Sequence, residues 1–95
     1  MLLNKPIKEG SIVTLKMQSG EEIIARFESG DESHITVSKP SVLAQGPQGM
    51  GMIPWIMSAQ SQKITLNKSN IVAQISTDED IAKSYTQATS SIQIV

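Results

Sequence analysis

The sequence predicts a mostly β domain, a small and strongly bent open barrel of five short strands with a short C-terminal helix. Three observations predict it. A chain of 95 residues has room for one domain, expected over residues 1–95 with a core over 11–76 and a helix and tail over 77–95. Short runs of alternating apolar and polar residues are separated by turn-forming residues. The segment after the last run has the pattern of a helix.

The first two strands are expected to form a β-hairpin. Apolar residues alternate with polar ones over residues 12–18 and again over 22–28. Ser19 and Gly20, between these runs, predict a two-residue turn, which is a common hairpin connection.

The next two strands are less regular in sequence. The third is expected over residues 34–42, and Pro40 predicts a bend or an edge position because proline cannot donate to a ladder. A loop tip follows at 45–49. The fourth strand is expected to begin near Met50, in a run that is apolar on both faces, and its alternation resumes at 64–66 beyond a polar bulge or loop. Residues 44–62 are interpreted as an extended hairpin.

The chain is expected to end with a fifth strand over residues 71–76 and the helix. Thr77 suits the N-cap of this helix, and the acidic residues that follow suit the positive end of its dipole. Ile81, Tyr85 and Ala88 fall on one face, which we expect to pack against the barrel.

Composition excludes several kinds of site. The chain has no cysteine and one histidine, His34, so a disulfide scaffold, a thiolate metal site and a multi-histidine metal site are all excluded. It also lacks the arrangement of Ser, His and Asp found in catalytic triads, and it has no glycine-rich phosphate loop. We therefore expect a protein without catalytic residues, metal or other cofactor, and not an enzyme.

Charge and hydropathy restrict the partners. A net charge of −1 does not favour wholesale neutralisation of phosphates. No apolar run approaches the roughly 20 residues that cross a bilayer, and the N-terminus does not resemble a signal peptide. The sequence predicts a cytoplasmic protein with no membrane partner. The short, phage-like chain suggests a viral source, which would place it in the host cytoplasm.

The predicted core is thin, because Phe27, Trp55 and Tyr85 are the only aromatic residues. Short chains with thin cores often bury further apolar surface against another subunit. The composition therefore favours an oligomer.

Five short strands fit an SH3-like barrel, an OB-fold or an Sm-like fold. The spacing of the turns resembles the Sm and Sm-like family. Residues 13–20 fit the opening strand and glycine turn of its first motif, Ala25 and Phe27 fit its small and large apolar positions, and Asp31 fits its aspartate.

Two departures from that pattern concern the binding positions. Ser33 and His34 stand where the family has Met-Asn, and Lys68 and Ser69 stand where its second motif has Arg-Gly. The resemblance covers about residues 12–76.

The resemblance implies that the two motif turns line the pore of a ring and bind single-stranded RNA, in RNA processing or RNA chaperoning. Asp31 is expected to accept backbone N–H bonds in its turn. His34 either stacks on a base or is an ordinary polar residue that opens a strand, and Lys68 either supplies charge or is a solvated turn lysine. The residues at the implied site are Asp31, Ser33, His34, Lys68, Ser69 and Asn70.

The resemblance also implies a homo-oligomer of about five to seven subunits, in which the fourth strand of one subunit pairs with the fifth strand of its neighbour. A run that is apolar on both faces suits such burial, although it also suits the core of a single chain. Trp55 and the methionines beside it are either a second contact surface or packing. The residues expected at the interface are Met50, Met52, Ile53, Trp55, Ile56, Met57, Ile71, Val72 and Ile75.

Two other functions remain open. One is a structural or adaptor ring that binds protein partners, for instance in a phage. The other is a monomeric binding domain of the SH3-like or OB type.

Overall fold

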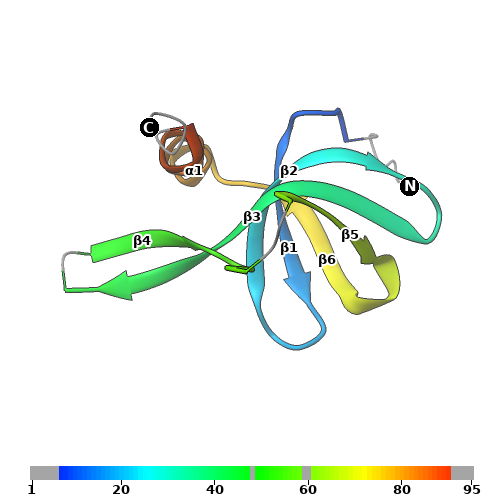
Figure 1. Ribbon diagram of the computed structural model, residues 1–95, viewed down its shortest axis with the longest axis horizontal. Coiled ribbons are helices and arrows are strands. Elements are labelled where there is room, and N and C mark those ends of the chain that lie inside the picture. Colours follow the sequence, from blue (N-terminus) through cyan, green and yellow to red (C-terminus); the bar gives the residue numbers. More distant parts are fainter. Residues whose placement is uncertain (1–6, 48, 59–60, 91–95) are drawn as a thin grey trace.

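The computed structural model describes residues 7–47, 49–58 and 61–90. They form six antiparallel strands in one open sheet, followed by one helix (Figure 1). The elements are β1 (Ile12–Met17), β2 (Glu22–Gly30), β3 (His34–Gly46), β4 (Gly49–Pro54), β5 (Lys63–Asn67), the 3-10 turn η1 (Lys68–Asn70), β6 (Ile71–Ser76) and α1 (Glu79–Ser90). The predicted mostly β class and C-terminal helix are confirmed, but the predicted count of five strands is wrong.

The extra strand arises because β3 is long and has two partners along one edge. Its first half pairs with β5, from His34 opposite Asn67 onward, and its second half pairs with β4, up to Gly46 opposite Gly49. Its other edge pairs with β2. The main path through the sheet is β4-β3-β2-β1-β6 (Figure 1).

The second half of β3 and β4 form a hairpin, residues 41–54, which we name the arm (Figure 1). An extended hairpin is therefore present as expected, but over residues 41–54 instead of 44–62. The third strand does not end at Val42, and the polar segment 58–62 lies between two strands instead of interrupting one. Gly49, with φ of 109°, has the left-handed backbone that this turn requires.

The bend predicted at Pro40 is confirmed. The register between β3 and β2 shifts between the pairs Ile24–Ser41 and Arg26–Ser38, and Lys39 in the shifted segment has φ of 50°. This is a β-bulge, and it lies where β3 passes from one partner strand to the other.

The core lies between the strands of the curled sheet. Residues that alternate along β1, β2 and the first half of β3 point inward, as their periodicity predicts. The buried cluster consists of Val13, Leu15, Met17, Ile23, Ala25, Ile35, Val37 and Leu66.

The β1–β2 hairpin is confirmed, with a longer turn than expected. The N–H of Met17 donates to the carbonyl O of Glu21 at 2.8 Å, and the N–H of Gly20 donates to the carbonyl O of Met17 at 2.9 Å. Three residues therefore make the turn, and Gly20 takes the left-handed conformation with φ of 103°.

Helix α1 packs through the predicted face. Tyr85 is fully buried, and its hydroxyl lies 3.1 Å from the carbonyl O of Ser38 and 2.9 Å from that of Lys39, to which it donates. Ile81 and Ala88 are half-buried. The tyrosine thus fixes the helix to the bend of β3.

The N-cap prediction is wrong by one residue. The Asp78 carboxylate accepts the N–H groups of Asp80 at 3.1 Å and Ile81 at 3.3 Å, so Asp78 caps α1. The hydroxyl of Thr77 instead shares a 2.8 Å hydrogen bond with that of Thr14. Thr77 therefore joins the helix linker to β1.

Candidate functional site

The two turns that the sequence singled out lie side by side in the fold. The N–H of Lys68 donates to the carbonyl O of Ser33 at 2.8 Å, and His34 is the register partner of Asn67. The pairing of β3 with β5 thus brings together segments that are more than thirty residues apart in sequence. All six predicted binding residues are exposed.

Asp31 organises the β2–β3 turn, as expected. Its carboxylate accepts the N–H groups of Ser33 at 2.8 Å and His34 at 2.7 Å. These hydrogen bonds, helped by the nearby charges of His34 and Lys68, hold the pKa of Asp31 below its ordinary value. The carboxylate therefore stays ionised at neutral pH and accepts both hydrogen bonds.

A shallow hollow of about 370 Å³ lies beside His34. Thr36 and Thr65 line it, and their hydroxyls are 2.9 Å apart. Neither threonine was predicted from the sequence to lie at the site. Alternation places Thr36 on the same face of β3 as His34, but the register of β5 is needed to bring Thr65 beside it.

The second turn continues through Ser69 and Asn70 in η1. The carbonyl O of Asn70 accepts the N–H of Gln18 at 2.8 Å, which ties this turn to the β1–β2 turn. Neither side chain lines the hollow beside His34. The structure therefore groups Asp31, Ser33, His34 and Lys68 closely, with the other two residues farther along the chain.

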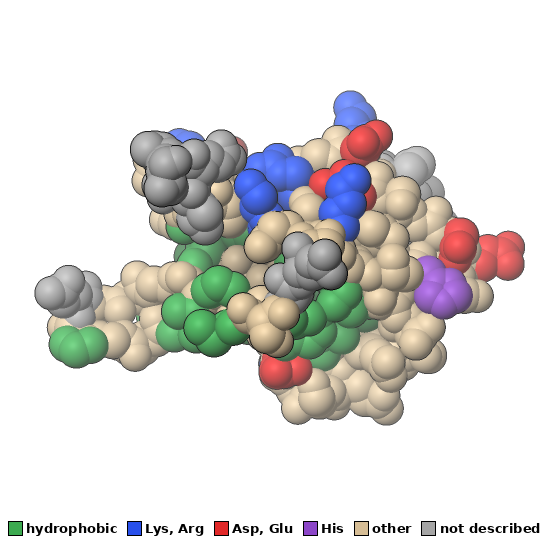
Figure 2. Space-filling view, in the orientation of Figure 1, with side chains coloured by type: hydrophobic (Ala, Val, Ile, Leu, Met, Phe, Trp, Pro, Cys, Tyr) green, Lys and Arg blue, Asp and Glu red, His purple; other side chains and the backbone are tan. Residues whose placement is uncertain are grey.

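The charge of this end of the molecule is mixed. The positive charge of Lys68 helps to lower the pKa of Asp31. The side chain of His34 lies 3.7 Å from the same carboxylate. Figure 2 shows acidic side chains next to the histidine, at the end opposite the arm. Hydroxyls, an imidazole and one ammonium group can bind a polar planar group here, but the site has little positive charge for phosphates.

Most of the residues predicted at an interface are exposed. Six large apolar side chains are exposed by 36% to 81%, and all six belong to the predicted set. Four lie on the arm or just after it, and two lie on β6. They are Met50, Ile53, Ile56, Met57, Val72 and Ile75.

The other three predicted interface residues, Met52, Trp55 and Ile71, are half-buried. Trp55 and Ile71 pack against the core cluster of their own chain, so their burial needs no neighbour. Met52 faces Leu43 across the arm.

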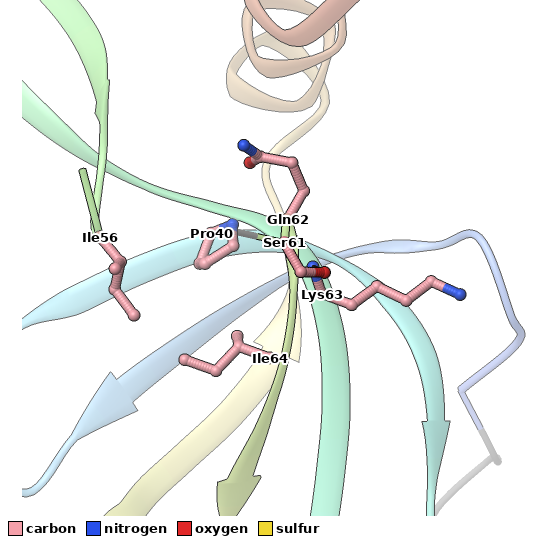
Figure 3. A pocket seen from close by; sticks show the side chains of 6 residues that line it. All are labelled: Pro40, Ile56, Ser61, Gln62, Lys63 and Ile64. Atoms are coloured by element: carbon pink, nitrogen blue, oxygen red, sulfur yellow. The ribbon is translucent and has the colours of Figure 1, made fainter. Parts of the chain in front are cut away.

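A second hollow, of about 200 Å³, lies at the bend of β3 (Figure 3). Pro40, Ile56 and Ile64 point toward one another there, and Gln62 and Lys63 point away. The hollow is small and mainly apolar inside, and it lies where β3 changes partner. We interpret it as a gap in packing at the bulge.

The described residues contain no group of three carboxylate, imidazole or thiol side chains that could hold a metal ion. They also contain no helix with the length and apolar character needed to span a membrane.

Comparison with known proteins gives no family: no family model matches the chain, and no curated protein matches its sequence. The site is therefore interpreted from its own geometry.

Proposed function

We propose that this chain is a subunit of a homo-oligomeric Sm-like ring that binds single-stranded RNA at its pore. The juxtaposition of the β2–β3 turn with η1, through the hydrogen bond from Lys68 to Ser33, carries the proposal. In such a ring β6 of one subunit pairs with β5 of the next, and the joined turns of all subunits face the central opening.

Support for assembly comes from β6. Among the described residues this strand pairs only with β1, so its other edge is open. Val72 and Ile75 are 67% and 64% exposed. An unpaired edge with exposed apolar side chains is a template for another strand. β5 offers the complementary edge, because it pairs only with β3 in the same part of the chain.

Support for RNA comes from the kinds of group beside the turns. Unstacked bases stack on flat side chains and hydrogen-bond at their edges. The half-exposed imidazole of His34 supplies a flat face, and the hydroxyls of Thr36 and Thr65 lie next to it. Lys68 adds one positive charge per subunit, and ring symmetry multiplies that charge.

The test is the fluorescence anisotropy of labelled oligo(U) and oligo(A) mixed with the full chain. We expect His34→Ala to weaken binding about tenfold through lost stacking. Lys68→Ala should weaken binding and also flatten the salt dependence, by about 0.7 in log–log slope for each phosphate that the lysine no longer neutralises. Lys83→Ala, on α1 at the other side of the molecule, is the matched control and should change neither.

RNA binding at the turns is refuted if both variants bind like the wild type. The same result, with a ring still present in solution, would favour the second candidate, a structural or adaptor ring with protein partners. The observation in favour of that candidate is the acidic neighbourhood of Lys68, in which Asp31 is ionised and Glu32 is exposed.

A further inference from the structure

A third surface lies away from both the turns and the β5–β6 edges. A groove of about 690 Å³ runs between the arm and the β1–β2 turn. Val42, Ile53, Trp55 and Met57 are among the apolar side chains that line it. Figure 2 shows hydrophobic side chains along the arm and where it joins the body, with an acidic side chain at their border.

In the proposed ring, pairing through β5 and β6 leaves this groove open, although Met50, Ile53, Trp55 and Met57 in its lining were expected at the subunit interface from the sequence. Pairing of β5 with a neighbour's β6 engages residues 63–67 and 71–76, and the arm lies farther along the edge of β3. Met57 is 81% exposed and Met50 is 60% exposed. Exposed methionines beside an aromatic residue are common at adaptable protein-binding surfaces.

The border of the groove carries a fixed negative charge. The Glu21 carboxylate accepts the Ser19 hydroxyl at 2.9 Å and the indole N–H of Trp55 at 3.2 Å. Both donors are neutral, and within the described residues neither Glu21 nor Glu22 forms a salt bridge. The carboxylate is thus held in place beside an apolar surface without a cation to balance it.

We propose that this groove binds a protein segment that presents apolar side chains next to lysine or arginine. The apolar side chains of the partner enter the groove between the arm and Trp55. Its cationic group pairs with Glu21, whose orientation is already set by two hydrogen bonds. The groove thereby gives the chain a second binding function, for a basic and apolar peptide.

Trp55, the only tryptophan, reports directly on occupancy of the groove. Its emission is followed while the full chain is titrated with a blocked hexapeptide of alternating leucine and lysine. We expect a saturable change in emission. A hexapeptide of alternating leucine and glutamate should bind at least about tenfold more weakly, because its charge matches that of Glu21 and Glu22. One of alternating serine and lysine should also bind at least about tenfold more weakly, because it has no apolar anchor.

Variants locate the site. Glu21→Gln and Met57→Ser should each weaken binding of the leucine–lysine peptide about tenfold. Their matched controls are Glu32→Gln, an exposed acid in the β2–β3 turn, and Val72→Ser, an exposed apolar residue on β6. Both controls should bind like the wild type.

Equal affinity for the lysine and glutamate peptides, or no loss in Glu21→Gln and Met57→Ser, would overturn the proposal. So would an emission of Trp55 that depends on protein concentration and not on peptide, since a second copy would then occupy the groove. None of these readouts depends on RNA binding at the turns.

Discussion

Lys39 adopts a backbone conformation that a residue with a side chain seldom takes. Its φ of 50° is left-handed, and the next residue is Pro40, which further restricts its backbone. The surrounding bonds hold it there: its N–H donates to the carbonyl O of Gln62 at 2.8 Å, and its own carbonyl accepts the hydroxyl of Tyr85. At this residue local strain is balanced by contacts to β3's neighbours and to the helix.

Substitution at this position should depend on backbone freedom more than on charge. Lys39→Val should lower the free energy of unfolding by about 1–2 kcal/mol, because a β-branched residue is least tolerant of the left-handed region. Lys39→Gly should stay within about 0.5 kcal/mol of the wild type, since relief of strain is offset by the entropy of glycine in the unfolded chain. Urea unfolding measures both.

Lys16→Val, at an exposed position of β1 with ordinary strand backbone, is the control and should be nearly neutral. A Lys39→Val variant as stable as this control would show that the bend carries no strain.

At the scale of the element, one side chain fixes α1 to the sheet. Tyr85 is buried, and its hydroxyl donates to backbone carbonyls at the bend. Burial, with a smaller contribution from the charge of Glu28, raises the pKa of Tyr85 to about 12, and Arg26 opposes this. The folded chain therefore favours the neutral phenol, which is the form that donates the hydrogen bond.

Removing this hydroxyl should have an effect that depends on pH. At pH 8, Tyr85→Phe should lower the free energy of unfolding by about 1 kcal/mol through loss of the hydrogen bond. Because the folded pKa is raised, the contribution of the hydroxyl is complete below the ordinary tyrosine pKa of 10.0 and is lost as pH rises toward about 12. Urea midpoints of both proteins should therefore stay apart up to about pH 10 and converge between about pH 10 and pH 12. A constant difference across this range would contradict the role given to the phenol.

At the scale of the whole molecule, the open sheet leaves edges that a single chain does not pair. The dimensions of 41 × 27 × 25 Å reflect an arm that extends from a small body (Figure 1). Exposed apolar side chains lie on β6 and on the arm, and in the proposed ring only those of β6 lie at the contact with β5 of a neighbouring subunit. The two sets should therefore differ in their effect on assembly.

Light scattering at micromolar concentration should give a mass of about five to seven times the 10.3 kDa of one chain. Ile75→Lys should reduce the mass to that of one chain, because it places a charge in the β5–β6 contact, and its circular dichroism should remain that of a β protein. Met57→Lys, three residues beyond the arm, should leave the mass unchanged. A wild-type protein that is a monomer at this concentration would disprove the ring.

The sequence was most informative where a local rule decides the structure. Alternation predicted β1, β2 and the inward set of Val13, Leu15 and Ile23, and the missing N–H of Pro40 predicted the bend. The helical spacing of Ile81, Tyr85 and Ala88 predicted the face of α1 that packs against the sheet. Each of these depends on residues that are close in sequence.

The features that could not be predicted depend on the register of strand pairing and on which of two adjacent residues caps the helix. Alternation does not reveal that β3 changes partner at Lys39, so the fourth predicted strand proved to be two strands, β4 and β5. The same change put Thr65 beside His34 and Trp55 beside Glu21. Asp78 displaced Thr77 as the cap because both types can cap, and only the path of the chain decides between them.

The arm leaves the body of the open sheet at a single bulge, and few of its side chains belong to the core cluster. Its length and its sequence can therefore change through insertion, deletion or substitution without disturbing the strands that hold the body together. Changes confined to the hairpin should therefore alter the surface of the molecule and leave its framework of strands the same.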